Sequence, residues 1–416
     1  MFLGILVLSL IIIALLLQSL MKIPTPITIL FCTIILKYLH ITYPLTSDTF
    51  DTLVILTIPL LITSDAIRLS FNELKEHWLS LFTVAVLAVI ISVGLGILVD
   101  YMILPEYHIG IAGVIMIMCM LTATDPVTVS SIFSTAKVPH KLKLLTEGES
   151  LFNDATALIL FSIAIMMLKD KDINAIHIFS QSSLMLGVAL FIGCAVGFIT
   201  TLLLRLTEDV MIETTIILLC AYASFGIAEF YHVSGILAVI VSVLIVNRQI
   251  DIANKSQKIL KVMKKQIHTL HNQQQMNHIF EYFSIIFSSL LFIAIAIVTD
   301  ITQLFTFWKE ILLMFVISTI IRAVTMAKFA FMSNNVSRMH NVSIHWWGVL
   351  TMAGSKGALS LLMAHMIPDT YPHKILFENI IIGNILLSTI TYTIGLYLIL
   401  YLFRNRFNQE IVYEYI

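Results

Sequence analysis

Charged side chains are scarce in this sequence. Of its 416 residues, 12% are Asp, Glu, Lys or Arg and 59% are hydrophobic, whereas soluble domains carry about 25% charged residues. There is also no excess of one charge, since the formal net charge is −1, which excludes a nucleic-acid binder that depends on a strong basic field. The composition therefore predicts a polytopic membrane protein.

Several functional signals are absent as well. The cysteines lie inside apolar runs without the spacing of metal ligands, so we interpret them as small packing residues: Cys32, Cys119, Cys194 and Cys220. The strings Gly-x-Gly-Asp and His-Glu-x-x-His, expected of intramembrane proteases, do not occur. We therefore expect neither an enzyme nor a cofactor. The first twenty residues lack a basic region and a cleavage site, which favours a first span over a signal peptide.

Long apolar runs occupy most of the chain. A spanning helix needs roughly 20 apolar residues, which predicts an all-α protein of about thirteen spans. They are expected at 3–20, 24–41, 51–67, 79–103, 109–135, 144–168, 180–205, 210–230, 233–247, 280–299, 309–331, 345–367 and 376–403.

Loop charges predict the orientation. The loops around 42–50, 104–108 and 231–232 contain no Lys or Arg, whereas the alternate loops do. The positive-inside rule then places the N-terminus outside and the C-terminus in the cytoplasm, in what we expect is a bacterial plasma membrane. Residues 248–279 alternate lysines with apolar residues at helical spacing, which predicts a basic amphipathic segment on the inner leaflet.

The spans divide symmetrically about 180–205, which leaves six on each side, 3–168 and 210–403. The fifth span of the first half contains Asp125-Pro126, and the fifth of the second half contains Gly354 to Gly357. Interrupted segments at matching positions indicate an inverted-repeat transporter with a binding site near the membrane midplane. We expect 1–416 to form a single transporter domain.

The first interrupted segment contains polar groups that suit a cation. Pro126 disfavours helix at Asp125, and broken backbone at membrane depth is tolerated only inside protein or beside a water-filled cavity. Its carbonyls and the hydroxyls of Thr122, Thr124 and Thr128 are oxygen ligands for a hard monovalent cation. The alternative is a proline kink whose own threonines satisfy the freed backbone.

The next span contains two carboxylates. Glu149 and Asn153 are four residues apart, as are Ser150 and Asp154, so these side chains lie on neighbouring stripes of one helix. Asp154 follows a neutral amide and is the better candidate for a group that holds either a proton or a cation. That competition is what an exchanger requires.

Two cations also lie in apolar segments. Arg322 and Lys356 each need a counter-ion, because an unpaired buried charge is strongly destabilising. We predict that Glu149 pairs with Arg322 as a structural contact. Lys356 is predicted to compensate helix ends at the second interruption.

Five blocks together resemble the cation:proton antiporter family, which includes the NhaP-type and NHE-type sodium/proton exchangers. The blocks are Thr124-Asp125-Pro126, Glu149 to Asp154, Val233 to Ala238, Arg322 and Gly354 to Ser360. The resemblance implies a fold of 13 spans with inverted repeats and broken crossing helices, a homodimer and alternating access. The implied activity is exchange of Na⁺, or else Li⁺ or K⁺, for H⁺; a cation channel is a weaker alternative.

The resemblance also implies roles for individual residues. Asp154 would bind the ion or the proton, with Na⁺ coordinated by Thr124 and Ser150 as well, while Asp125 and Asn153 would orient the site. Glu149 and Arg322 would form the buried pair, and Asn153 before Asp154 resembles the electroneutral branch. The chain departs from the family pattern at Lys356, where arginine is frequent, and at Ser64, where a glutamate is frequent and Asp65 is the nearest acid. Asp65 and Ser64 are therefore weaker candidates for the ion site.

Overall fold

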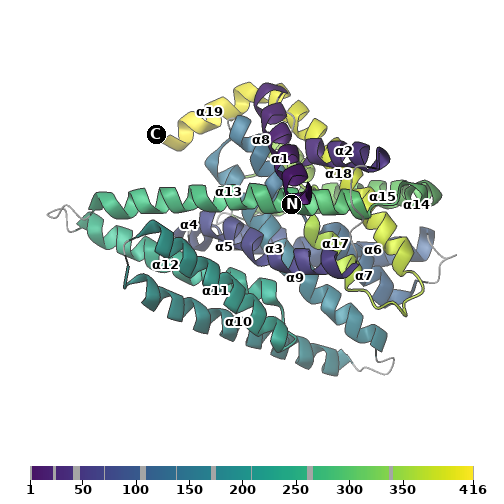
Figure 1. The fold of residues 1–416 in the computed structure, drawn as a ribbon, viewed down its shortest axis with the longest axis horizontal. Coiled ribbons are helices and arrows are strands. Elements are labelled where there is room, and N and C mark those ends of the chain that lie inside the picture. Colours follow the sequence, from purple (N-terminus) through teal and green to yellow (C-terminus); the bar gives the residue numbers. More distant parts are fainter. Residues whose placement is uncertain are drawn as a thin grey trace. The chain divides into compact units, whose positions relative to one another are not determined.

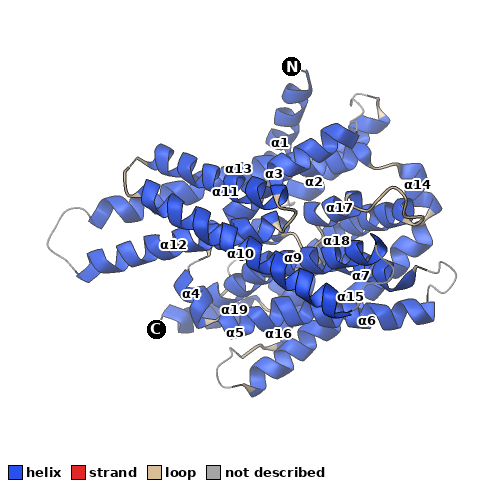
Figure 2. Cartoon of the chain, turned by 90° about the horizontal axis from the view of Figure 1, so that it is seen from below, coloured by secondary structure: helices blue, strands red, loops and turns tan. Residues whose placement is uncertain are grey.

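The computed structural model describes most of the chain. The described residues are 2–21, 25–40, 47–69, 71–103, 109–136, 138–169, 175–207, 209–259, 266–336 and 341–415. Within these ranges every regular element is a helix and no strand occurs (Figure 2). The all-α prediction is confirmed for the part of the chain that can be described.

Each apolar segment predicted from the sequence coincides with helix. The elements of the first half are α1 (Phe2–Met21), α2 (Thr25–Tyr38), α3 (Ser47–Arg68), α4 (Phe71–Glu76), α5 (Trp78–Phe82), the π-helical turn η1 (Thr83–Leu87), α6 (Ala88–Ile103), α7 (Gly110–Thr122), α8 (Pro126–Thr135) and α9 (His140–Lys169). Those that follow are α10 (Ala175–Leu204), α11 (Val210–Phe230), α12 (Gly235–Ile259), α13 (Gln266–Val298), α14 (Ile301–Thr306), α15 (Trp308–Asn335), α16 (Ile344–Met352), α17 (Ala358–His365), α18 (Lys374–Leu402) and α19 (Arg404–Tyr415).

Two of the predicted spans are each divided into two helices. α7 and α8 are separated at 123–125, and α16 and α17 at 353–357. The first break follows from Pro126, which has no N–H to give to the preceding turn and excludes helical geometry from the residue before it. Ala123, the first residue of the break, is extended, with φ −58° and ψ 137°.

Length and composition identify seven described helices that could cross a membrane. Four further apolar helices are shorter, at 5–20, 25–38, 110–122 and 235–250. A span that is divided into two short helices does not meet the length criterion, so the seven helices do not include such spans. Thirteen spans and two inverted repeats stay a prediction.

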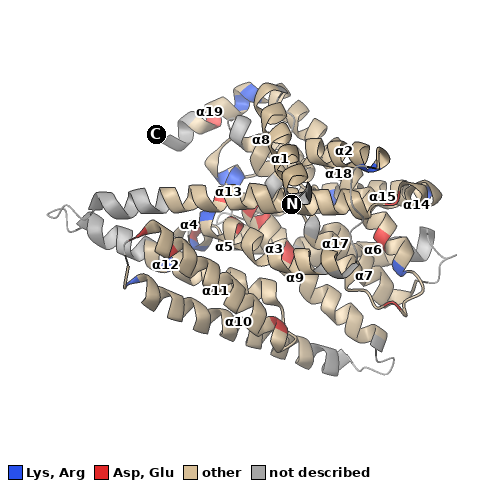
Figure 3. Ribbon diagram, viewed as in Figure 1, with Lys and Arg blue, Asp and Glu red and all other residues tan. Residues whose placement is uncertain are grey.

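The chain packs as two compact units. The first comprises Met1–Val54, Leu79–Lys171 and Ser288–Ile416, and the second comprises Ile55–Trp78 and Asp172–Phe287. In the first unit α9 packs on α7, α8 and η1, while α18 packs on α15, α16 and α17. This unit therefore contains both divided spans. The ribbon drawn in Figure 3 is largely without charged side chains along the spanning helices.

The second unit is built around α12, which packs against α10, α11 and α4. Helices α10, α11 and α12 lie side by side in Figure 1. The amide of Asn247 on α12 donates to the carbonyls of Ala66, Ile67 and Leu69 at distances of 3.0 to 3.1 Å. These carbonyls lie at the C-terminal end of α3 and just beyond it, where helical hydrogen bonding stops, and the Ala66 carbonyl also accepts from the N–H of Leu69 at 3.3 Å. Asn247 therefore closes the end of α3.

The expected amphipathic segment at 248–279 falls mostly outside the described side chains. Helix α12 continues to Ile259 and α13 begins at Gln266, and residues 260–265 lie outside the described residues. His278 is described and lies 3.6 Å from Glu281. Contact with the inner leaflet stays a prediction.

The contact between α10 and α12 depends on two glycines. A Cβ at Gly193 would come within 2.7 Å of the Ala238 carbonyl, and one at Gly197 within 2.8 Å of the Ser242 carbonyl. Backbone atoms cannot move aside as the tip of a flexible side chain can. The two helices therefore approach this closely only with glycine at these positions.

We expect Gly197→Ala to destabilise the second unit by about 1–3 kcal/mol, because the added methyl forces α10 and α12 apart. The measurement is the thermal unfolding midpoint of the purified protein. Gly187→Ala is the matched control on the same helix, since nothing lies within 4 Å of a Cβ at that position. Equal midpoints for the two variants would contradict the close approach.

Candidate functional site

The two breaks meet inside the first unit and bind each other through the backbone. The N–H of Asp125 donates to the carbonyl of Ser355 at 2.7 Å. The Ser355 hydroxyl lies 3.4 Å from the Asp125 carbonyl, and that of Ser360 lies 3.5 Å from the Ala123 carbonyl. Each break thus supplies hydrogen bonds that the other has lost by leaving the helix.

Asp125 caps the second half of the first broken span. Its Oδ2 accepts from the backbone N–H of Thr128 at 3.2 Å and from the Thr128 hydroxyl at 2.7 Å. An aspartate before the first helical residue, with proline at that residue, is a favoured helix start. The negative charge also lies at the positive end of the α8 dipole. Asp125 therefore stabilises the start of α8 through Thr128.

Glycine is required at the second break because two neighbours are close. A Cβ at Gly357 would lie 2.6 Å from the Cβ of Asp125. A Cβ at Gly354 would lie 2.1 Å from Nε of Arg322. The glycines of this sequence block are thus needed for two buried charges to approach the backbone.

Asp154, Thr124 and Ser150 come together at the first break. The N–H of Thr124 donates to Oδ1 of Asp154 at 3.1 Å. The Thr124 hydroxyl donates to Oγ of Ser150 at 3.1 Å, and the Ser150 hydroxyl donates to the Thr124 carbonyl at 3.0 Å. Thr124 and Ser150 are buried, whereas Asp154 is half-buried. Carboxylate, hydroxyl and carbonyl oxygens are thus grouped on one side of α9.

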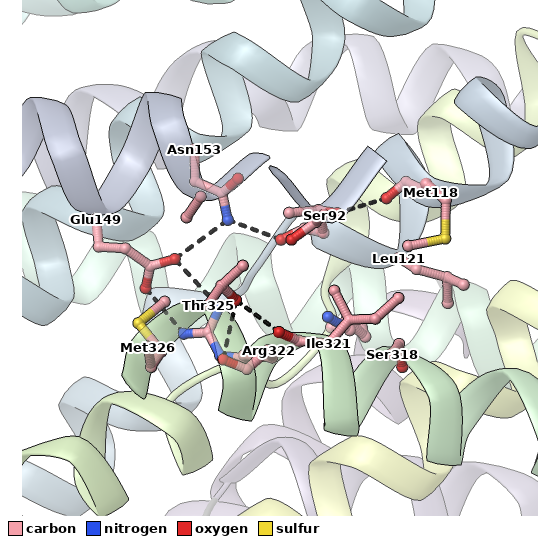
Figure 4. Close-up of a pocket in the computed structure, with 13 residues that line it drawn as sticks. Ser92, Met118, Leu121, Glu149, Asn153, Ser318, Ile321, Arg322, Thr325 and Met326 are labelled. Atoms are coloured by element: carbon pink, nitrogen blue, oxygen red, sulfur yellow. Dashed lines mark hydrogen bonds and ion pairs between the residues drawn. The ribbon is translucent and has the colours of Figure 1, made fainter. Parts of the chain in front are cut away.

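Asn153 links this group to a buried ion pair (Figure 4). Its amide donates to the Thr122 carbonyl at 2.7 Å and to Oε1 of Glu149 at 3.2 Å. The Thr122 carbonyl is one of those left without a helical partner where α7 ends. Asn153 therefore satisfies a carbonyl of the broken backbone and contacts the ion pair at the same time.

Glu149 and Arg322 form the ion pair that the sequence predicts. Two guanidinium nitrogens of Arg322 contact the two carboxylate oxygens of Glu149, at 2.9 and 3.2 Å. Glu149 is 1% exposed and Arg322 is 7% exposed. Arg322 also donates to the carbonyls of Thr351 and Leu350, at 3.1 and 2.9 Å. These carbonyls belong to the last turn of α16, so one guanidinium closes that helix and binds α9.

Lys356 is also buried here, at 3% exposure, and its electrostatic neighbours are Arg322, Glu149 and Asp154. Its backbone N–H donates to the Ser388 hydroxyl at 3.0 Å. The side chain lines a cavity of about 20 Å³ together with Glu149, Asn153 and Arg322, which is room for one water molecule. Lys356 thus interacts through space with the charges of α9.

The sequence identified most of these groups but not all their partners. The hydroxyls of Thr122 and Thr128 bond within their own half-helices, to Met118 and Asp125, as the proline-kink alternative expects. Ser355, Ser360 and Ser388 were not anticipated, since serine inside an apolar run carries no spacing signal. Ser64 and Asp65 belong to the second unit, where the Ser64 hydroxyl donates to the Phe280 carbonyl at 3.0 Å. Their part in ion binding stays a prediction.

Removal of either partner of the buried pair is expected to lower the free energy of unfolding by about 3–5 kcal/mol, because the other charge is stranded. Glu149→Ala and Arg322→Ala should therefore both give a low yield of folded protein, measured by size-exclusion profile and thermal unfolding. Glu281→Ala is the control, since Glu281 is 50% exposed and pairs at 3.6 Å with a His278 side chain that is 72% exposed. Normal yield and stability in both pair variants would contradict the structural role.

Comparison with known proteins identifies the family and the fold. The family model described as "Sodium/hydrogen exchanger, transmembrane" matches residues 5–400. The structure resembles that of the sodium proton antiporter MjNhaP1 from Methanocaldococcus jannaschii, with a TM-score of 0.71 over 99% of both chains and 14% sequence identity. At that identity the likeness shows the fold.

Curated relatives carry antiporter names. The chain is 25% identical over 329 residues to the Na(+)/H(+) antiporter NhaG of Bacillus atrophaeus, covering 77% of this chain and 58% of the relative. For the Na(+)/H(+) antiporter NhaH of Halobacillus dabanensis the identity is 32% over 203 residues, covering 47% of this chain and 49% of the relative. The chain thus spans about half to three-fifths of these relatives' length. Because the family model covers almost the whole chain, this protein belongs to the transmembrane sodium/hydrogen exchanger family, a family of transporters rather than enzymes.

Proposed function

We propose that this protein exchanges Na⁺ for H⁺ across a membrane, with Asp154 holding either ion in turn. The observation that carries the proposal is the group of oxygens around Asp154. Its Oδ1 accepts from the N–H of Thr124 at 3.1 Å, and the hydroxyls of Thr124 and Ser150 are 3.1 Å apart. Carboxylate, hydroxyl and carbonyl oxygens are the ligands that hard cations prefer.

The same atoms serve both loaded forms. When Asp154 is ionised, Na⁺ is attracted to its carboxylate, and the hydroxyl oxygens of Thr124 and Ser150 turn their lone pairs towards the ion. When Asp154 carries a proton its charge is gone, and the hydroxyls return to bonding each other and the Thr124 carbonyl. One carboxylate cannot bind both, so entry of one ion requires release of the other.

The buried charges support a one-for-one exchange. With Lys356 protonated, the cluster holds three carboxylates, Asp125, Glu149 and Asp154, against two cations, Arg322 and Lys356. One negative charge is left over, and a single Na⁺ or a single proton neutralises it. Both loaded forms then have the same charge, so the step that carries the site across the membrane moves none. That makes the cycle electroneutral.

The cycle needs alternating access but no chemical energy. A proton from the acidic side loads Asp154, the loaded site becomes exposed to the other side, and Na⁺ displaces the proton there. The direction follows the two gradients, because the protein supplies no energy. We infer from the loop charges that the N-terminus is outside and the C-terminus in the cytoplasm of a bacterial cell. A homodimer is part of the proposal and is supported by the family alone.

K⁺/H⁺ exchange is the second candidate. Ser64 stands where a glutamate is frequent in the family, and loss of that carboxylate bears on which cation is preferred. A cation channel is less favoured, because a conducting path has no use for a carboxylate that alternates between proton and cation.

Asp154→Asn should abolish cation-coupled proton flux without unfolding the protein, because the amide keeps the shape but holds neither ion. The measurement is proton flux in sealed proteoliposomes with an imposed pH gradient, on addition of Na⁺, K⁺ or Li⁺ in turn. Asp369→Asn is the matched control, the same change at a side chain that is 95% exposed. Cation-coupled flux retained in Asp154→Asn would contradict the assignment of Asp154 as the ion-binding carboxylate.

Flux in the wild type should not depend on the membrane potential, because one charge enters for each that leaves. The same vesicles, with the potential clamped by K⁺ and valinomycin at two values, give the measurement with Na⁺ as the substrate. Equal rates at both potentials are expected. Rates that follow the potential would show that the one-for-one stoichiometry is wrong.

A further inference from the structure

The side-chain amine of Lys356 is buried without a hydrogen-bond acceptor. Lys356 is 3% exposed, and among the described residues no oxygen accepts a hydrogen bond from its Nζ. Its charged neighbours, Arg322, Glu149 and Asp154, act on it through space. Nζ carries donor hydrogens whether or not it is protonated, and a buried donor that makes no hydrogen bond is destabilising. The amine therefore needs an acceptor within the cavity that Lys356 lines.

Asn153 has the opposite need, an acceptor that lacks a donor. Its Nδ2 donates to the Thr122 carbonyl and to Oε1 of Glu149. Both partners accept only, so the amide must hold its nitrogen towards them and its oxygen away. That oxygen, Oδ1, is buried and has no hydrogen-bond partner within the described part of the chain. Asn153 and Lys356 line the same cavity, which Figure 4 shows.

Small side chains from two helices leave this space open. Helix α6 begins with Ala88 directly after the π-helical turn η1, and Ser92 follows four residues later on the same face. On α15, Ser318 and Thr325 lie about one turn to either side of Arg322. Their hydroxyls donate to carbonyls of their own helix, so their oxygens can still accept. The cavity volume of about 20 Å³ is enough for one water molecule.

The charges around the cavity favour a neutral occupant. A cation would lie beside Lys356 and Arg322, whereas an anion would lie beside Glu149 and the amide oxygen of Asn153. The volume excludes molecules larger than water. A water molecule can donate two hydrogen bonds and accept two, so it can satisfy Nζ and Oδ1 at once and still reach a hydroxyl oxygen of the wall. A buried water makes about three such bonds.

We propose that this cavity is a built water site, in which one tightly held water accepts from Nζ of Lys356 and donates to Oδ1 of Asn153. The water joins Lys356 to the hydrogen-bonded network of Glu149, Arg322 and Asn153, to which the amine makes no direct bond. It belongs to the structural charges and not to the hydration shell of the transported cation. The water site does not depend on the proposed exchange function.

The test is hydroxyl-radical footprinting with X-rays on the full chain in lipid nanodiscs, with methionine oxidation measured by mass spectrometry. The radicals form from water where it lies, so a buried methionine is oxidised readily only beside bound water. Met118 and Met326 line the cavity and are 3% and 1% exposed. Each has a buried counterpart away from the cavity on the same helix, Met120 at 0% on α7 and Met314 at 3% on α15.

In the wild type we expect the two cavity methionines, Met118 and Met326, to be oxidised several times faster than their counterparts, Met120 and Met314. Equal rates for the two pairs would overturn the water site. This comparison requires no substitution, so it decides the question even where a variant fails to fold.

Two variants separate the space from the donor. Ala88→Val fills the cavity, and should lower oxidation of the cavity methionines to the rate of their counterparts. Lys356→Met retains the length of the side chain but removes the amine, and should lower it as well, because a less polar cavity holds water poorly. Gly94→Ala is the matched control on α6, since nothing lies within 4 Å of a Cβ there, and should keep the wild-type rates. Unchanged oxidation in Ala88→Val or in Lys356→Met would overturn the proposal.

The same measurement with Na⁺ replaced by N-methyl-D-glucamine distinguishes the water site from the transport site. Oxidation of the cavity methionines should not change, because the water is held by Lys356 and Asn153 whether or not a cation is bound. A rate that rises when Na⁺ is removed would show that the cation displaces this water. The cavity would then belong to the ion site, and the proposal would be overturned.

Discussion

The guanidinium of Arg322 connects three parts of the site that are far apart in sequence. It binds both oxygens of Glu149 on α9 and two carbonyls at the end of α16, and it reaches them because Gly354 has no side chain. Arginine offers five donors in a fixed planar arrangement, which a lysine cannot reproduce. A half-helix that ends inside a membrane has no water to satisfy its last carbonyls. The broken span is therefore stable only while this contact holds.

The other polar side chains of the site each bind or face a different part of it. Asp125 caps α8, Asn153 binds the last carbonyl of α7, and Lys356 compensates the carboxylates from within the cavity. Most polar atoms of the breaks are thus committed to the backbone. Asp154 differs, because it is half-buried and accepts the backbone N–H of Thr124 at 3.1 Å. In the proposed cycle this half-buried carboxylate is the one that takes the transported ion.

The sequence predicted the helices, the two breaks and the buried ion pair, but not the hydrogen bonds between distant segments. Apolar runs interrupted by Asp125-Pro126 and by Gly354 to Gly357 were enough to locate both breaks, because proline and glycine act on the backbone nearby. The pairing of Glu149 with Arg322 followed from the cost of an unpaired buried charge. The bond from Asp125 to Ser355 and the contact of the Ser360 hydroxyl with the Ala123 carbonyl join residues 230 and 237 positions apart. Local pattern contains no information on such contacts, which only the packing of the chain brings together.

The bond between the N–H of Asp125 and the carbonyl of Ser355 is made by groups that every residue except proline possesses. Side-chain substitutions at either position leave it intact, provided that the neighbouring residues stay small. The crossing of the two breaks is therefore tolerant of mutation in a way that the charged contacts around it are not. Sequence can therefore drift on both sides of the crossing while the backbone bond is retained.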